Sequence, residues 1–68
     1  MSVFPSPATS VINITNAEDD TMVRVFNVNG KMVLKANLKG NQLDISNLEK
    51  GVYIVDVENL GKVKFIKQ

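Results

Sequence analysis

Apolar and polar residues alternate along much of the chain with the period of two that a half-buried β-strand requires. The clearest stretch is 51–57 (Gly-Val-Tyr-Ile-Val-Asp-Val), whose main apolar face carries three side chains, Tyr53, Val55 and Val57. Val52 and Ile54 make the other face apolar too, which is typical of a central strand covered on both sides. We predict that this segment is the middle strand of a small sheet, entered through Gly51.

Two strand-like segments, 21–28 and 31–36, flank the dipeptide Asn29-Gly30. An Asn-Gly pair favours a two-residue hairpin turn, because both central positions of that turn need a positive φ angle. The sequence therefore predicts a β-hairpin that turns at Asn29 and Gly30.

Three further segments are predicted strands from their alternation and flanking turn signals: 11–15, 43–45 and 62–68. Residues 59–61 (Asn-Leu-Gly) fit a three-residue hairpin loop with glycine in the left-handed position. Residues 46–51 form a polar crossing, and its one apolar side chain, Leu48, is expected to pack beneath the turn. Helical periodicity is absent, so about six to seven short strands predict an all-β fold, an antiparallel sandwich or barrel.

The last predicted strand carries Lys62 and Lys64 on one face and Val63 and Phe65 on the other. Lysine on an edge strand is a common protection against edge-to-edge aggregation. We therefore expect this strand to form an edge of a sheet, with its lysines in solvent.

The N-terminal segment contains two prolines one residue apart, Pro5 and Pro7. Proline fixes φ and lacks a backbone donor, so this spacing favours an extended, polyproline-like path without ladder donors at the two prolines. We expect residues 1–8 to be a linker or lead-in segment and residues 9–68 to be the folded domain.

At 68 residues the chain has room for one domain, and a domain of this size buries only about 60% of its unfolded surface. A hydrophobic fraction of 44% with 22% charged residues is ordinary for a folded domain and too apolar for a disordered one. The net charge of +1 lacks the basic surplus of a nucleic-acid-binding protein. We expect one thin-cored domain without a nucleic-acid partner.

Cysteine and histidine are both absent, which excludes disulfides, thiol nucleophiles, histidine bases and nearly all zinc sites. Small secreted domains usually carry disulfides, so their absence favours a cytosolic protein or a bacterial export route that relies on packing alone. The chain has no apolar run of about 18 residues and no signal-peptide pattern. If the protein is exported, its signal is expected elsewhere in a longer chain.

The remaining polar residues offer no catalytic arrangement, because the hydroxyls lack a histidine and the lysines fall in turns or at outward positions. Asp44 and Asp56 are on different predicted strands and could face each other, although exposed carboxylates on a sheet more often serve solubility. The three acids of the 16–20 loop are suitable calcium ligands, but their spacing favours a solvated turn. We expect no enzyme activity, no metal and no cofactor.

Three motifs then occur in order. They are Pro-x-Pro-Ala-Thr at 5–9, Val-x-Val-Phe-x-Val-x-Gly-Lys-x-Val at 23–33 and Ile-x-x-Leu-x-x-Gly-Val-Tyr-x-Val at 45–55, followed by a lysine-bearing last strand. Together they resemble the C-terminal sorting domain, type A, of proteins exported by the type IX (Por) secretion system of Bacteroidetes. The family's opening motif usually reads Tyr-Pro-Asn-Pro, whereas Ser6 here replaces the asparagine.

The resemblance implies a small immunoglobulin-like β-sandwich at the C-terminus of a larger secreted or cell-surface protein. In that family the domain directs a covalently joined N-terminal cargo from the periplasm through the outer-membrane type IX translocon. A sortase-like protease then commonly removes the domain, and the cargo is left attached to anionic lipopolysaccharide. Exposed edge strands would accept a partner strand or allow a homodimer.

Carried to single positions, the resemblance divides the candidate residues into two sets. The sorting-recognition set consists of lysines near the C-terminus: Lys62, Lys64 and Lys67. The motif set is expected to maintain the fold and consists of Pro5, Pro7, Ala8, Gly30, Gly51 and Tyr53. The ring of Tyr53 should be buried with its hydroxyl paired. The alternative interpretation is a fibronectin-like binding or adhesion module of a cell-surface protein, which would be internal and repeated.

Overall fold

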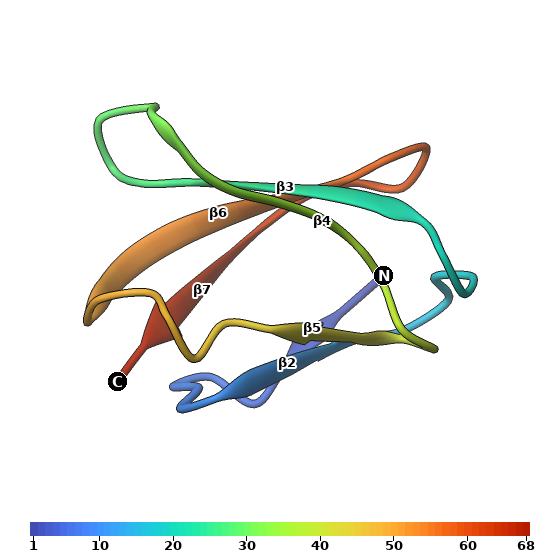
Figure 1. The fold of residues 1–68 in the computed structure, drawn as a ribbon, viewed down its shortest axis with the longest axis horizontal. Coiled ribbons are helices and arrows are strands. Elements are labelled where there is room, and N and C mark those ends of the chain that lie inside the picture. The colour runs from blue at the N-terminus through green and yellow to red at the C-terminus, as the bar shows by residue number, and fades with distance from the viewer.

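A computed structural model describes all of residues 1–68, which form two sheets packed face to face (Figure 1). The strands are β1 (Val3–Phe4), β2 (Val11–Ile14), β3 (Met22–Phe26), β4 (Met32–Asn37), β5 (Gln42–Asp44), β6 (Gly51–Val57) and β7 (Gly61–Lys67). The smaller sheet has the order β1-β2-β5 and the larger has the order β4-β3-β6-β7. Neighbouring strands within each sheet are antiparallel, so the predicted all-β antiparallel sandwich of six to seven strands is confirmed. No helix capable of crossing a membrane is present.

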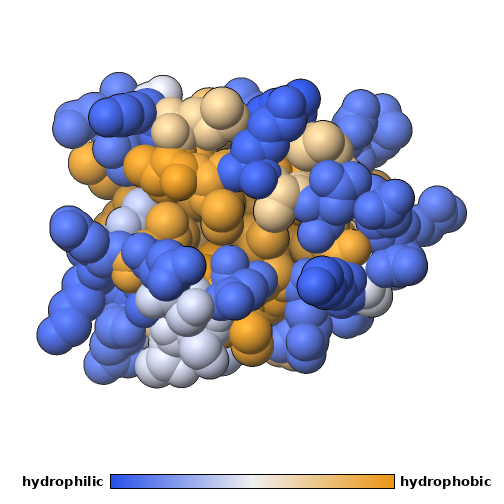
Figure 2. Space-filling view, viewed as in Figure 1, coloured by the Kyte–Doolittle hydropathy of each residue, from blue (hydrophilic) through white to orange (hydrophobic).

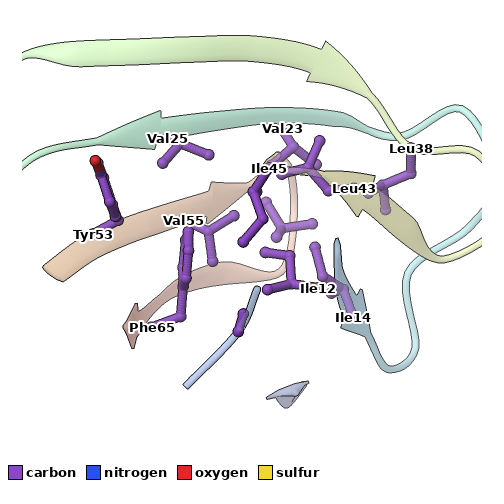
Figure 3. Packing of buried hydrophobic residues seen from close by; sticks show 12 residues of the cluster. Ile12, Ile14, Val23, Val25, Leu38, Leu43, Ile45, Tyr53, Val55 and Phe65 are labelled. Carbon is purple, nitrogen blue, oxygen red and sulfur yellow. The ribbon is translucent and has the colours of Figure 1, made fainter. Parts of the chain in front are cut away.

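The core lies between the two sheets and is built from every second residue of the long strands (Figure 3). Ile12 and Ile14 of β2 and Val23 and Val25 of β3 are fully buried in the same cluster, as the alternation predicts. No polar or charged side chain is buried, so the removal of apolar surface from water is the main stabilising term. Figure 2 shows apolar residues reaching the surface between the sheets, because a domain of this size cannot cover its core completely.

β6 lies between β3 and β7, so its predicted place inside a sheet is confirmed. The prediction that both its faces are covered is wrong. Tyr53 points into the core, but Val52 on the other face is 39% exposed and Ile54 is only half-buried. A two-layer sandwich buries one face of each sheet, and the second face of β6 therefore meets solvent.

The predicted hairpin is present as β3 and β4, but its turn differs from the predicted one. Gly30 has a φ of 80°, whereas Asn29 is outside the left-handed region. The Gly30 N–H donates to the Asn27 carbonyl at 3.0 Å, which makes 27–30 the turn. The Asn27 side-chain oxygen also accepts the N–H groups of Asn29 and Lys31 at 2.9 and 3.0 Å. These local bonds favour a longer turn with a single left-handed residue over a two-residue turn.

Gly30→Ala should lower the free energy of unfolding by about 1–2 kcal/mol. A Cβ at this position would meet no atom within 4 Å, so the φ of 80° is the only source of the loss. Chemical denaturation measures it, with Gly30→Asn as the matched variant, because asparagine tolerates the left-handed region better. Equal losses for the two variants would contradict this backbone explanation.

The β6–β7 hairpin is also one residue away from its predicted position. The Leu60 N–H donates to the Val57 carbonyl at 3.0 Å, and Val57 pairs with Gly61 across the strands. The loop is therefore 58–60, and Asn59 holds a left-handed conformation with φ of 68°. Asparagine adopts this conformation more readily than other non-glycine residues. Gly61 also has a positive φ, of 114°, but it pairs with Val57 and lies just after the loop.

The first eight residues are part of the sandwich. β1 pairs with β2, and Ser2 accepts the Thr15 N–H at 2.9 Å beside that pair. Ala8 is 0% exposed, and both of its backbone polar groups bond to the C-terminal segment. Its N–H donates to the Ile66 carbonyl and its carbonyl accepts the Gln68 N–H, both at 2.7 Å. The segment therefore closes the space between the two sheets.

The path between β1 and Ala8 bends at Ser6 and Pro7, and the peptide bonds before Pro5 and Pro7 are both cis. The predicted extended, polyproline-like path is therefore wrong, because the segment bends between the β1 pairing and the Ala8 bridge. The bend brings the chain from the smaller sheet to the edge of β7 within a few residues. A role of residues 1–8 in joining a preceding domain stays a prediction.

Candidate recognition face

The strand β7 carries the candidate recognition lysines and is an edge of the larger sheet. Its residues alternate between two faces, and the face turned away from the core carries Lys62, Lys64 and Ile66. Lys62 and Lys64 are exposed, whereas Lys67 has the opposite parity and is half-buried beside Ala8. The structure therefore brings two of the three candidate lysines together and separates the third from them.

The backbone edge of β7 is free over its first part and covered at its end. Ala8 bonds to the Ile66 carbonyl and lies beside Lys67 in a parallel bridge. Because the backbone groups of a strand alternate between its two sides, those of Lys62 and Lys64 also point away from β6. Unpaired donors and acceptors thus remain beside the same two exposed lysines.

Two rows of side chains cross the outer face of the larger sheet, the face turned away from the core. One row is charged and runs across the four strands as Lys35, Arg24, Asp56 and Lys62. The neighbouring row is largely apolar and consists of Met32, Phe26, Ile54 and Lys64. Val52 and Ile66 pair next to it and extend the apolar area. The charged row has a single carboxylate between its cations.

The apolar area borders a hollow of ≈710 Å³, here called the outer groove. Its lining includes Phe26, Val28, Val52, Ile54 and Lys62. β3 ends at Phe26, so Val28 lies in the turn and is 75% exposed, although the sequence predicts it in a strand. Sequence reasoning missed the groove because it assigned Val28 to a strand and the second face of β6 to the protein interior.

A second, polar hollow of ≈490 Å³ lies beside the acidic 16–20 loop. No group of three or more acidic side chains is placed so that it could hold a metal ion. Asp19 instead accepts the Gly40 N–H at 2.7 Å, and the Thr21 hydroxyl donates to the Glu18 carbonyl at 2.7 Å. These hydrogen bonds hold the loop as a turn. The calcium interpretation has no support.

Asp44 and Asp56 do not form a carboxylate pair. Asp44 lies in β5 of the smaller sheet and Asp56 in β6 of the larger sheet, and each alternates with buried neighbours. They therefore belong to opposite outer faces of the sandwich, and the prediction that they could face each other is wrong. Hydrogen bonds from the side chain and the backbone of Ser46 lower the pKa of Asp44, whereas a general acid near neutral pH needs a raised pKa.

Tyr53 lies at the end of the core where β6 begins. Its ring is buried and stacks on Phe65, with ring centroids 5.6 Å apart and an interplanar angle of 24° (Figure 3). The hydroxyl donates to the Glu49 carbonyl at 2.7 Å, so the predicted burial and pairing are confirmed. Leu48, in the same crossing, packs against the core as predicted. Tyr53 thus ties the polar crossing to the start of β6.

The geometry defines a small antiparallel β-sandwich with a cation-bearing edge and an apolar outer groove. The sequence model of a family described as "Secretion system C-terminal sorting domain" matches residues 2–68. Beta-agarase D of Zobellia galactanivorans is 37% identical over 57 residues, which are 84% of this chain and 12% of that protein. No solved structure gives a significant match.

The chain therefore belongs to the family of type IX secretion system C-terminal sorting domains. The match covers both the β1 segment and the lysine-bearing last strand, so it extends over nearly the whole sandwich. The alternative of a fibronectin-like adhesion module finds no support in these comparisons.

Proposed function

We propose that the chain is a non-enzymatic secretion signal that directs a covalently joined N-terminal cargo through the outer-membrane type IX translocon. The family match over residues 2–68 carries this proposal. A relative that is matched over only 12% of its length fits a short sorting domain joined to a much larger cargo. The cargo would reach the periplasm by a separate signal and end at the cell surface or in the medium.

Recognition is assigned to Lys62 and Lys64, because both are exposed and border unpaired backbone groups at the free edge of β7. A translocon component could add a strand at this edge, and a second copy of the domain could do the same. Lys67 remains a candidate, although it lies half-buried beside Ala8. Removal of the domain by a sortase-like protease and attachment of the cargo to lipopolysaccharide complete the proposed route.

The proposal is tested with a fluorescent protein that carries a periplasmic signal and is fused before residues 1–68, in a bacterium with a type IX system. Fluorescence should reach the surface or the medium, and this export should be lost when the translocon is deleted. A reporter that stays in the periplasm, with its attached domain shown to be folded, would contradict the sorting function and favour an adhesion module.

Lys64→Ala should leave the free energy of unfolding within about 0.5 kcal/mol, because the side chain is exposed. Export of the same fusion should fall several-fold if this lysine takes part in recognition. Thermal unfolding and reporter export are measured together, with Lys39→Ala in the β4–β5 turn as the matched control. A large loss of stability, or unchanged export, would remove Lys64 from the recognition set.

A further inference from the structure

We propose that the outer groove is a docking site for a segment of a partner protein that presents apolar side chains beside carboxylates. The inference rests on the proposed sorting function for its biological setting and defines the chemistry of the partner. It concerns the outer face of the larger sheet, whereas the proposed strand addition concerns the backbone edge of β7. The two surfaces meet at Lys62 and Lys64.

Apolar exposure on this face is concentrated in one area. Val28 is 75% exposed, and Met32, Val52 and Ile66 are each exposed by about two fifths or more. Phe26 and Ile54, half-buried between them, form the floor. An exposed apolar area of this kind marks an interaction site more often than a scattered single residue does.

The charges around the groove select among possible occupants. Lys35, Arg24, Lys62 and Lys64 stand in the two rows that cross this face, and Asp56 is the only carboxylate among them. A second copy docked through the same face would bring these cations together, which is unfavourable. A partner with carboxylates beside its apolar residues would instead pair with the cations while its apolar groups fill the hollow.

The shape of the site favours a protein segment over a membrane surface. The hollow of ≈710 Å³ lies between the 27–30 turn and β6. Its lining is mainly apolar and includes Val28, with Lys62 as its one charged residue. An open hollow lined by apolar side chains can accept side chains that protrude from a partner protein. The groove therefore matches a ridge of side chains on a protein.

The test uses the purified 68-residue chain and a short fluorescent peptide in which leucines are flanked by glutamates. Fluorescence anisotropy should show saturable binding that weakens as salt is raised. The same peptide with lysines in place of the glutamates should bind at least about tenfold more weakly, which corresponds to about 1.4 kcal/mol. This reversed-charge peptide separates groove binding from general stickiness.

Two substitutions test the groove itself. Val28→Asp and Lys62→Glu should each weaken binding of the glutamate peptide about tenfold. Their matched controls are Leu60→Asp, in the loop at the other end of the sheet, and Lys39→Glu, in the β4–β5 turn, which should bind as the unchanged chain does. Val28 and Leu60 are both exposed loop residues, so neither change should unfold the domain.

Equal binding of the two peptides, absence of binding, or equal losses in the control variants would overturn the inference. Binding only to phosphatidylglycerol vesicles would assign the face to a membrane, and a dimer lost in Val28→Asp would assign it to a second copy. Both results would overturn it too. Peptide binding without translocon-dependent export would contradict the sorting function alone. Export that survives while groove selectivity is absent would contradict the groove alone.

Discussion

Replacing Tyr53 with alanine should lower the free energy of unfolding by about 3–5 kcal/mol. The ring is 7% exposed and stacks on Phe65, so its removal leaves a cavity at the end of the core. It also removes the hydroxyl that donates to the Glu49 carbonyl. Natural domains are stable by only about 5–15 kcal/mol, and a small one falls near the lower limit. Urea denaturation should therefore show a variant that is largely destabilised or unfolded.

The control for this experiment is Tyr53→Phe, which keeps the ring and removes only the hydroxyl. It should cost about 0.5–1.5 kcal/mol, the usual net value of one hydrogen bond. Similar losses for the phenylalanine and alanine variants would show that the hydroxyl, and not the ring, holds the crossing to β6. Loss of export in Tyr53→Ala would report unfolding, whereas loss in the folded phenylalanine variant would indicate direct recognition.

The strands that sequence alone could predict are those with strict alternation. β2, β3 and β6 bury every second residue, and the apolar residues on one parity of each segment define the inner face. The turns were less predictable, because the 27–30 turn depends on the Asn27 side chain and not only on the Asn-Gly pair. Local propensity thus identified both hairpins, and the side-chain hydrogen bonds of Asn27 account for the turn of the first one.

The N-terminal segment was unpredictable for a different reason. Its two prolines exclude ladder bonds at their own positions, which in the sequence is the pattern of a linker. The segment is held at β1 by β2, which follows within a few residues, and at Ala8 by the last strand, at the other end of the sequence. A two-residue strand and a single buried alanine carry no periodic signal, so only the tertiary structure reveals them.

The candidate site was partly readable. Alternation along the last strand places Lys67 on the opposite face from Lys62 and Lys64. The lysines of this strand also predict its position at the edge of a sheet. The outer groove was missed because an apolar second face is also the pattern of a strand buried on both sides. The number of layers decides between those two cases, and a chain of this length has only two.

Removal of residues 1–8 should lower the melting temperature by more than about 10 °C, because each kcal/mol lost shifts it by about 4–8 °C in a domain of this size. The truncated chain loses the β1–β2 pairing, the Ser2–Thr15 bond and both backbone bonds of Ala8 to the last strand. It also exposes core side chains that Ala8 now covers. Thermal unfolding followed by circular dichroism measures the change.

Removal of Met1 alone is the matched control and should leave the melting temperature nearly unchanged, because this residue lies outside β1 and is exposed. If a chain of residues 9–68 has the same melting temperature as the full chain, residues 1–8 are instead a linker that contributes little to the stability of the sandwich. The expected loss bears on the proposed removal of the domain from its cargo, because only a cut before Ser2 would keep all of these contacts. Released fragments that begin at Thr9 would therefore be less stable than intact domains, and limited proteolysis should cleave them faster.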